Sequence, residues 1–167
     1  MQRGQVVLVD TNVVIEAFRA RCWRAVSSHF AVEIVEKCYE EALTGDPLRP
    51  GYIVVDAAQL QMGLQKRHAV SAVQRAQVKA RLTYPDALDA GETDLLAHTL
   101  GRSDAWIASC ADRAAVNAAL ELGWEEHFIS LEAMARAAGA TPTLKHHFTD
   151  RWLSEVRTTY KLEQVLK

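Results

Sequence analysis

Acidic side chains stand in four separated segments of the sequence, too far apart to act together unless the fold gathers them. Ionised carboxylates within a few ångströms of one another repel unless a cation lies among them. If the folded chain brings these side chains together, they would therefore form a metal site. The candidate metal-binding acids are Asp10, Glu36, Glu92, Asp94 and Asp112.

The chemistry of such a site follows from its ligand atoms. Carboxylate oxygens are hard ligands, so we expect Mg²⁺ or Mn²⁺ in place of zinc. An ion of this kind turns a bound water into a nucleophile near neutral pH and screens the charge of a phosphate, which is the chemistry of phosphodiester hydrolysis. Thr11 and Asn12 can hold Asp10 or a metal-bound water in position. Arg113 can meet a substrate phosphate.

Two predicted strands carry Asp10 and Asp112 to one edge of a sheet. Val6–Val9 is an unbroken aliphatic run, typical of a strand that is buried on both faces of a parallel sheet. Ala105–Cys110 is a second predicted strand. Asp10 ends the first strand and Asp112 follows the second, and open parallel sheets bind ligands beyond the carboxyl ends of their strands. The alternation of strands and helical segments predicts an α/β domain with a mainly parallel sheet.

A helix predicted over Glu33–Leu43 carries the second acid. Glu36 lies on the acidic face of this helix, and Glu33 and Glu40 share that face. Any of the three can be the acid that reaches the site. These three residues and Glu41 can also form a solvated acidic surface without a function.

A helix predicted over Gly91–Leu100 carries the third acid. Glu92 and Asp94 both lie in its first turn, and both are candidates. Acids in this position are also favoured by the helix dipole without any function. A similar alternative holds for Asp10 and Asp112, because each precedes a predicted helix and can act as its N-cap.

Length and composition fit one domain. We expect it over residues 1–140, with a helical segment at about 57–82, and a helical extension of the same domain over 141–167. The formal charge of −2 excludes a broad cationic coat, so any affinity for nucleic acid must be local. Three dispersed cysteines suggest reduced thiols, and the apolar run before Asp10 is too short for a signal peptide or a membrane span. We therefore expect a cytoplasmic protein without a membrane partner.

The sequence around these acids resembles the PIN-domain family of nucleases. The segment VVLVDTNVVIEAF, residues 6–18, looks like the opening strand and the Asp-Thr-Asn motif of that family. AVEIVEKC lies where the family places its second acid, GETDLLAHTL resembles the third motif, and SCADRAA resembles the fourth. The segment at about 57–82 looks like the helical arm that PIN domains insert between their second and third acids.

This resemblance implies a PIN-like three-layer sandwich, in which helices flank a mainly parallel central sheet. It also implies an Mg²⁺- or Mn²⁺-dependent endoribonuclease that hydrolyses phosphodiester bonds in single-stranded or structured RNA. Asn12 would position the first acid, and Glu92 would be a further metal ligand. The catalytic acids implied by the resemblance are Asp10, Glu36, Asp94 and Asp112.

The resemblance leaves the partners of the chain open. Many small PIN proteins are VapC-type toxins that an antitoxin protein inhibits, so the chain can be such a toxin or a free-standing nuclease. In the C-terminal tail, Trp152, Val156 and Tyr160 recur at helical spacing. This stripe favours core packing or a homodimer contact over RNA binding.

Two other functions compete with the nuclease. The first is a catalytically silent PIN-like protein that acts as a binding module, because Cys110 and Ala111 stand where the family often has polar residues. The second is a magnesium-dependent phosphotransfer enzyme, which also uses an aspartate after a hydrophobic strand. The haloacid-dehalogenase pattern of that class needs another Asp where this chain has Asn12.

Overall fold

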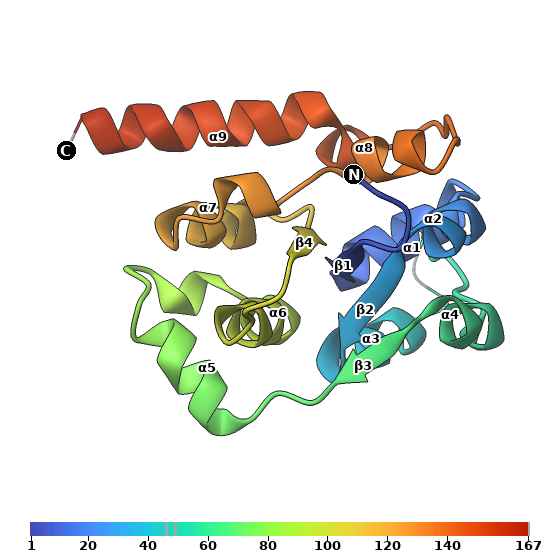
Figure 1. Ribbon diagram of the computed structural model, residues 1–167, viewed down its shortest axis with the longest axis horizontal. Coiled ribbons are helices and arrows are strands. Elements are labelled where there is room, and N and C mark those ends of the chain that lie inside the picture. Colours follow the sequence, from blue (N-terminus) through green and yellow to red (C-terminus); the bar gives the residue numbers. More distant parts are fainter. Residues whose placement is uncertain (46, 49, 167) are drawn as a thin grey trace.

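A four-stranded sheet forms the centre of the chain in this computed structural model, which describes residues 1–45, 47–48 and 50–166 (Figure 1). The strand order is β3-β2-β1-β4, and each neighbouring pair is parallel. Helices flank both faces of the sheet, so the predicted α/β fold with a parallel central sheet between helical layers is confirmed. The strands are β1 (Val6–Val9), β2 (Ala31–Val35), β3 (Lys66–His68) and β4 (Trp106–Ser109).

Helices make up most of the remaining described chain. None of the helices in this described part combines the length and the apolar character that a membrane crossing requires. The described residues also form three short 3₁₀ turns, η1 (Pro85–Ala87), η2 (Glu125–His127) and η3 (His146–Phe148). The α-helices are α1 (Thr11–Arg19), α2 (Trp23–His29), α3 (Glu36–Leu43), α4 (Ala57–Gly63), α5 (Ala72–Lys79), α6 (Ala90–Leu100), α7 (Arg113–Glu121), α8 (Leu131–Ala137) and α9 (Asp150–Val165).

The alternation of side chains along β1 divides the apolar core into two clusters. Val7 and Val9 belong to the cluster that includes α1, α2, α4 and α8. Leu8 belongs to the other cluster, with α5, α6, α7 and α9. Figure 1 shows α5, α6 and α7 on one side of the sheet and α1, α2 and α4 on the other. Because β1 is buried on both faces, its sequence is an unbroken apolar run.

The order of the strands reverses next to β1. The chain first adds β2 and β3 on one side of β1, and then crosses to place β4 on the other side. Open α/β sheets bind ligands at such a switch point, in the crevice beyond the carboxyl ends of the two strands. Val9 pairs with Ser109 at the ends of β1 and β4. The residues that follow these two positions therefore meet at the switch point.

The region between α2 and α6 differs from the sequence prediction. Glu33–Val35 belongs to β2, and the helix that was predicted to start at Glu33 starts at Glu36. The reason is tertiary, because β2 pairs with β1 on one side and with β3 on the other. The predicted helical segment 57–82 contains α4 and α5, but β3 separates them at the edge of the sheet.

Helix α9 packs against the rest of the chain. Trp152 and Val156 are buried in the second apolar cluster, so this part of the predicted stripe packs on the core. Arg157 donates hydrogen bonds of 2.5 and 2.6 Å to two main-chain carbonyl oxygens between α7 and α8. Lys167, the last residue of the predicted C-terminal extension, lies outside the described residues.

Candidate functional site

Asp10 lies where β1 ends and α1 begins. Its carboxylate caps α1 by accepting a hydrogen bond from the Asn12 amide at 3.3 Å, and the Cys38 thiol donates to it at 3.8 Å. Burial raises the pKa of Asp10 to about 6, despite hydrogen bonds from the Thr11 and Asn12 amides that lower it. The charge of Asp89 contributes to the rise. Asp10 is therefore a buried carboxylate that titrates near neutral pH.

Asp112 reaches the same place from the neighbouring strand. The Asp10 amide donates a hydrogen bond of 3.1 Å to the Ser109 carbonyl, so the chain after β1 stays paired with the end of β4. Asp112 then caps α7, and its carboxylate accepts hydrogen bonds from the Ala114 and Ala115 amides at 2.6 and 3.2 Å. The two aspartates thus follow neighbouring strands at the switch point.

Glu92 and Asp89 contribute carboxylates from the start of α6. They form a capping box, in which Asp89 accepts from the Glu92 amide at 2.8 Å and Glu92 accepts from the Asp89 amide at 3.0 Å. Burial raises the pKa of Glu92 to about 8 despite the hydrogen bond from Asp89. The charges of Asp112, Asp89 and Asp10 contribute to this rise. We refer to Asp10, Asp89, Glu92 and Asp112 as the acid cluster.

Glu41 brings a fifth carboxylate next to the acid cluster. Helices α3 and α6 approach closely because residue 91 is glycine: a Cβ atom there would lie 2.8 Å from Oε2 of Glu41 and 3.0 Å from the sulfur of Cys38. The Thr11 hydroxyl donates to Oε2 of Glu41 at 3.0 Å. Lys37 lies 3.6 Å from the other carboxylate oxygen of Glu41. Glu41 therefore joins α3 to the first turn of α1 beside the acid cluster.

The acid cluster has little positive charge to balance it. In the part of the chain that the structure describes, no lysine or arginine forms an ion pair with any of its four carboxylates. The N-termini of α1, α6 and α7 are capped here, and each contributes a partial charge of about +0.5. Burial is the main cause of the raised pKa values of Asp10 and Glu92, and the charges of neighbouring acids add to it. A cation at this place would relieve the repulsion.

Two buried thiols lie against the acid cluster. Burial raises the pKa of the Cys38 and Cys110 thiols well above the usual range, and the charge of Asp10 raises both further. Both thiols are therefore protonated near neutral pH and act as weak hydrogen-bond donors, not as thiolate ligands. The ligand atoms that the cluster offers are carboxylate oxygens.

The structure does not bring Glu36 to the acid cluster. Its carboxylate forms a double ion pair with Arg67 of β3, at 2.6 and 3.2 Å. On α3, Glu36 is about 200° around the helix from Cys38, whose thiol faces Asp10. Glu36 therefore points toward the edge strand. Glu40, another candidate for the second acid, is exposed.

Asp94 is also separated from the acid cluster. Its side chain is 3% exposed and forms an ion pair with two nitrogens of Arg75 on α5, at 2.5 and 2.8 Å. Asp94 follows Glu92 by two residues, which places the two side chains on opposite sides of α6. Asp94 therefore joins α5 to α6. Of the two first-turn candidates, Glu92 is the one that faces Asp10 and Asp112.

Glu33 belongs to a second polar group beside α6. Its carboxylate accepts a hydrogen bond from Arg102 at 2.6 Å and lies 2.8 Å from Nε2 of His68. Burial alone would raise the pKa of Glu33, but the hydrogen bonds from Arg102 and His68 lower it below its usual value. His98 stacks on His68 with ring centroids 3.9 Å apart and accepts a hydrogen bond from Arg102 at 3.0 Å.

The ligand atoms of this second group are close enough together to hold a metal ion. The ligand atoms of Glu33, His68 and His98 all lie within 4.8 Å of one another, and no other such group of His, Cys, Asp and Glu occurs among the described residues. However, one nitrogen of Arg102 contacts both Glu33 and His98, so a positive charge already fills the space between them. Asp104 holds the other side of that guanidinium. The group is therefore an ion-pair network that joins β2 and β3 to α6.

The acid cluster differs from this network in its ligands. It offers carboxylate oxygens, and no guanidinium of the described residues pairs with them, so the donor set suits a hard divalent cation. Among the described residues, no three of its carboxylates come within 4.8 Å of one another. Water would therefore complete the coordination of a bound ion, as is usual for Mg²⁺. The residues present fit magnesium or manganese.

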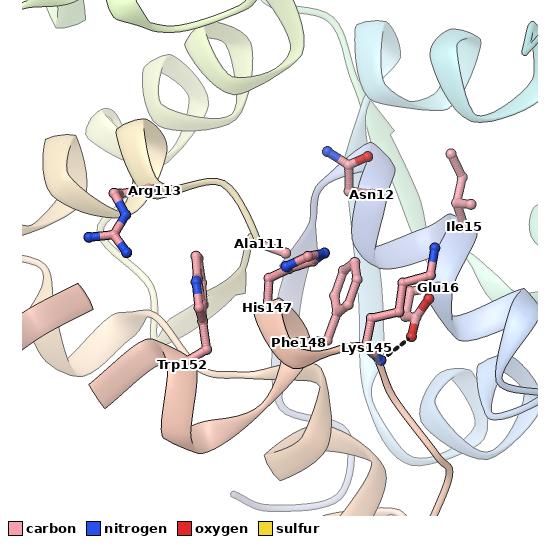
Figure 2. A pocket seen from close by; sticks show the side chains of 9 residues that line it. All are labelled: Asn12, Ile15, Glu16, Ala111, Arg113, Lys145, His147, Phe148 and Trp152. Atoms are coloured by element: carbon pink, nitrogen blue, oxygen red, sulfur yellow. Dashed lines mark hydrogen bonds between the residues drawn. The ribbon is translucent and has the colours of Figure 1, made fainter. Parts of the chain in front are cut away.

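The predicted supporting residues lie beside the acid cluster. Thr11 donates to Glu41, as described above. The side chains of Asn12 and Arg113 are exposed and line a pocket next to the cluster (Figure 2). Arg113 is thus available to a ligand that occupies this pocket.

Sequence reasoning missed Glu41 and Asp89. Glu41 follows Cys38 by three residues, the spacing that puts both on one face of a helix, and this face is the buried one. Asp89 and Glu92 form the Asp-x-x-Glu capping box, a pattern that the sequence alone contains. By contrast, Glu33 is bound by residues 35 and 69 positions away, for which no local signal exists.

Comparison with known proteins adds no family to these observations. No protein-family model matches the sequence, and no curated protein matches it. The geometry of the acid cluster and the resemblance of its sequence segments to PIN-domain motifs are therefore the grounds for a function.

Proposed function

We propose that this chain is a metal-dependent ribonuclease whose acid cluster holds Mg²⁺ or Mn²⁺. One observation carries the proposal: Asp10 and Glu92 are buried carboxylates with pKa values of about 6 and 8, next to a sheet switch point and without a cationic partner among the described residues. Strongly perturbed carboxylates in such a position are typical of functional sites. RNA is the proposed substrate because residues 6–18, 91–100 and 109–115 resemble PIN-domain motifs.

Three acids of the cluster are proposed to hold the ion, directly or through bound water, namely Asp10, Glu92 and Asp112, with Asp89 and Glu41 beside them. When bound, the ion supplies an activated water and neutralises charge on the phosphodiester. At pH 7 the Glu92 carboxyl group is mostly protonated, because its pKa is about 8. Binding of the ion therefore displaces a proton from this side chain.

The chain holds its carboxylates in position through its own hydrogen bonds. The Cys38 thiol and the Asn12 amide hold Asp10, and two α7 amides hold Asp112. The capping box holds Glu92. Ligands that are already in place lose little conformational entropy when an ion or a substrate binds. Most of these hydrogen bonds are the helix caps, so the contacts that cap α1, α6 and α7 also fix the proposed ligands.

A binding module without catalysis is the second candidate. One observation favours it: Asp10, Asp89 and Asp112 each cap a helix, so each has a structural reason to be acidic. Such a module would bind no metal at the acid cluster and would cut nothing. The two candidates therefore differ in a measurable property.

Incubation of the protein with labelled single-stranded RNA and millimolar Mn²⁺ tests the proposal. We expect the wild type to cut, and Asp10→Asn and Asp112→Asn to lose more than about 100-fold in rate. Glu36→Gln is the matched control, since its carboxylate pairs with Arg67 away from the cluster; it should keep its rate. A folded wild-type protein that cuts no RNA would overturn the proposal and favour the binding module. DNA of the same sequence tests the choice of substrate.

A further inference from the structure

A pocket of about 410 Å³ opens beside the acid cluster. One wall contains Asn12, two residues after Asp10, and the residues Ala111 and Arg113 on either side of Asp112 (Figure 2). The pocket therefore starts where two of the proposed metal ligands stand. Its volume lies in the range of small-molecule and cofactor sites.

Aromatic side chains form much of the opposite wall. Phe148 and Trp152 are largely buried, whereas His147 is exposed. The His147 ring lies between these two rings in Figure 2, with centroid distances of 5.4 Å to Phe148 and 6.5 Å to Trp152. An exposed ring supported by buried rings is a platform on which a nucleobase can stack.

Two cations line the same pocket. Arg113 and Lys145 are exposed. Among the described residues neither side chain forms an ion pair within 4.0 Å, although the charge of Lys145 helps to lower the pKa of the buried Glu16 carboxylate. Cations of this kind attract backbone phosphates and form charge-assisted hydrogen bonds with them. Because the chain as a whole has a formal charge of −2, such a local pair is needed to bring a polyanion close to an acid cluster.

The wall of the pocket is fixed before any ligand binds. The buried carboxylate of Glu16 on α1 accepts two hydrogen bonds of 2.6 Å from Arg19 and one of 2.7 Å from the Lys145 amide. Arg19 also donates to the Thr143 carbonyl at 2.8 Å. These contacts bind the C-terminal segment to α1 across more than a hundred residues of sequence. A preformed wall reduces the entropy that binding must overcome.

We propose that this pocket binds one unpaired nucleotide of an RNA strand, next to the bond that the acid cluster cleaves; the inference rests on the proposed function. The base stacks on His147, and Arg113 and Lys145, which lie on opposite sides of the His147 ring in Figure 2, contact phosphates of the same strand. Stacking on a ring requires a base that is free of its partner. The pocket therefore selects single-stranded RNA over a duplex.

Fluorescence anisotropy with a labelled single-stranded RNA of 12 nucleotides or so tests this assignment, in Asp10→Asn protein with Mg²⁺ so that the strand stays intact. We expect His147→Ala to raise Kd about tenfold. Its matched control is His146→Ala, since that neighbouring ring contacts Glu155 at 3.2 Å outside the pocket. The control should change Kd less than about twofold. A blunt RNA duplex should compete at least about tenfold less well.

A second pair of variants tests whether the positive charge in the pocket contributes to RNA binding. Arg113→Gln should raise Kd about three- to tenfold and lower the salt dependence by about one counterion. Arg151→Gln, which removes an exposed arginine that pairs with Glu155, should do neither.

The outcomes separate the inference from the proposed function. Equal Kd values for His147→Ala and His146→Ala, or a preference for the duplex, overturn the pocket assignment even if the wild type cuts RNA. A wild type that cuts no RNA, while His147→Ala still weakens binding, overturns the nuclease and supports the nucleotide pocket.

Discussion

The Asp10 amide donates a hydrogen bond of 3.1 Å to the Ser109 carbonyl, one residue beyond the paired ends of β1 and β4. Main-chain pairing, and not contact between side chains, therefore sets how close the first acid lies to the loop that carries Asp112. Conservative substitutions of the acids should leave this pairing intact. Loss of metal binding or activity in such variants can then be separated from loss of the fold.

Without metal, the protein should become less stable as the pH rises from about 4.5 to about 8. The pKa of Glu92 is raised from its ordinary value of 4.5 to about 8, so the folded state binds this proton more tightly than the unfolded state. The stability contributed by the protonated group is full below the unfolded pKa and is lost as the pH approaches the folded pKa. Asp10 acts in the same direction between 3.8 and about 6. Urea unfolding in a chelator at pH 5, 6.5 and 8 measures the effect.

Glu92→Gln is the informative variant in this series. It removes the titrating group, so the decline between pH 6.5 and 8 should largely disappear. Glu36→Gln changes an exposed ion pair and should keep the wild-type slope. A wild type whose stability rises over the same range would contradict the raised pKa values.

Arg75→Gln should destabilise the protein without abolishing the proposed cleavage. It leaves the buried carboxylate of Asp94 without its cation, while Arg75 itself is 44% exposed, so we expect a loss of about 1–2 kcal/mol in the free energy of unfolding. Urea unfolding measures this loss, and Asp94→Asn in the Arg75→Gln background should restore part of it. Cleavage assayed at a temperature where the variant is folded should stay within a few-fold of the wild type. A complete loss there would mean that the Arg75–Asp94 pair acts in the site.

Arg102→Ala should uncover a transition-metal site. The substitution removes the guanidinium that contacts both Glu33 and His98, and leaves three ligand atoms within 4.8 Å of one another. Without metal the variant should lose about 2–3 kcal/mol, because a buried carboxylate loses its main partner. Zinc at about 100 times its Kd should restore about 2.7 kcal/mol in the variant and little in the wild type. Thermal unfolding with and without zinc measures both effects.

His98→Gln in the Arg102→Ala background is the control for this site. It removes one of the three ligands, so the response to zinc should fall with it. An equal zinc response in the wild type, or one that survives loss of His98, would contradict the network described here.

The sheet edge that carries the first and fourth acids could be predicted from sequence. The aliphatic run before Asp10 and the strand before Asp112 both indicate parallel strands, and parallel strands bring their carboxyl ends to one edge. The side of the sheet on which β4 lies decides which acids meet. The order of the acidic motifs and their resemblance to PIN-domain motifs are consistent with β4 beside β1, but the local sequence does not determine the position of β4.

The helical acids could not be assigned in this way. In AVEIVEKC the apolar spacing fits a strand and a helix equally, and only the pairing of β2 with two neighbours puts Glu33 in the sheet. Helix α3 begins only at Glu36. The Glu36 side chain faces Arg67, and the Glu41 side chain lies on the side of the acid cluster. Similarly, the sequence places Asp94 in the first turn of its helix together with Glu92, whereas α6 begins at Ala90 and Asp94 pairs with Arg75 of α5. Long-range contacts therefore decide which helical acids reach the acid cluster.

Calorimetric titration with Mn²⁺ at pH 7.5 tests the central claim most directly. The acid cluster predicts a binding isotherm for the wild type, a loss of more than about tenfold in affinity for Asp10→Asn and for Glu92→Gln, and wild-type affinity for Glu36→Gln and Asp94→Asn. Absence of binding to the folded wild type, or equal losses in Glu36→Gln and Glu92→Gln, would contradict the account.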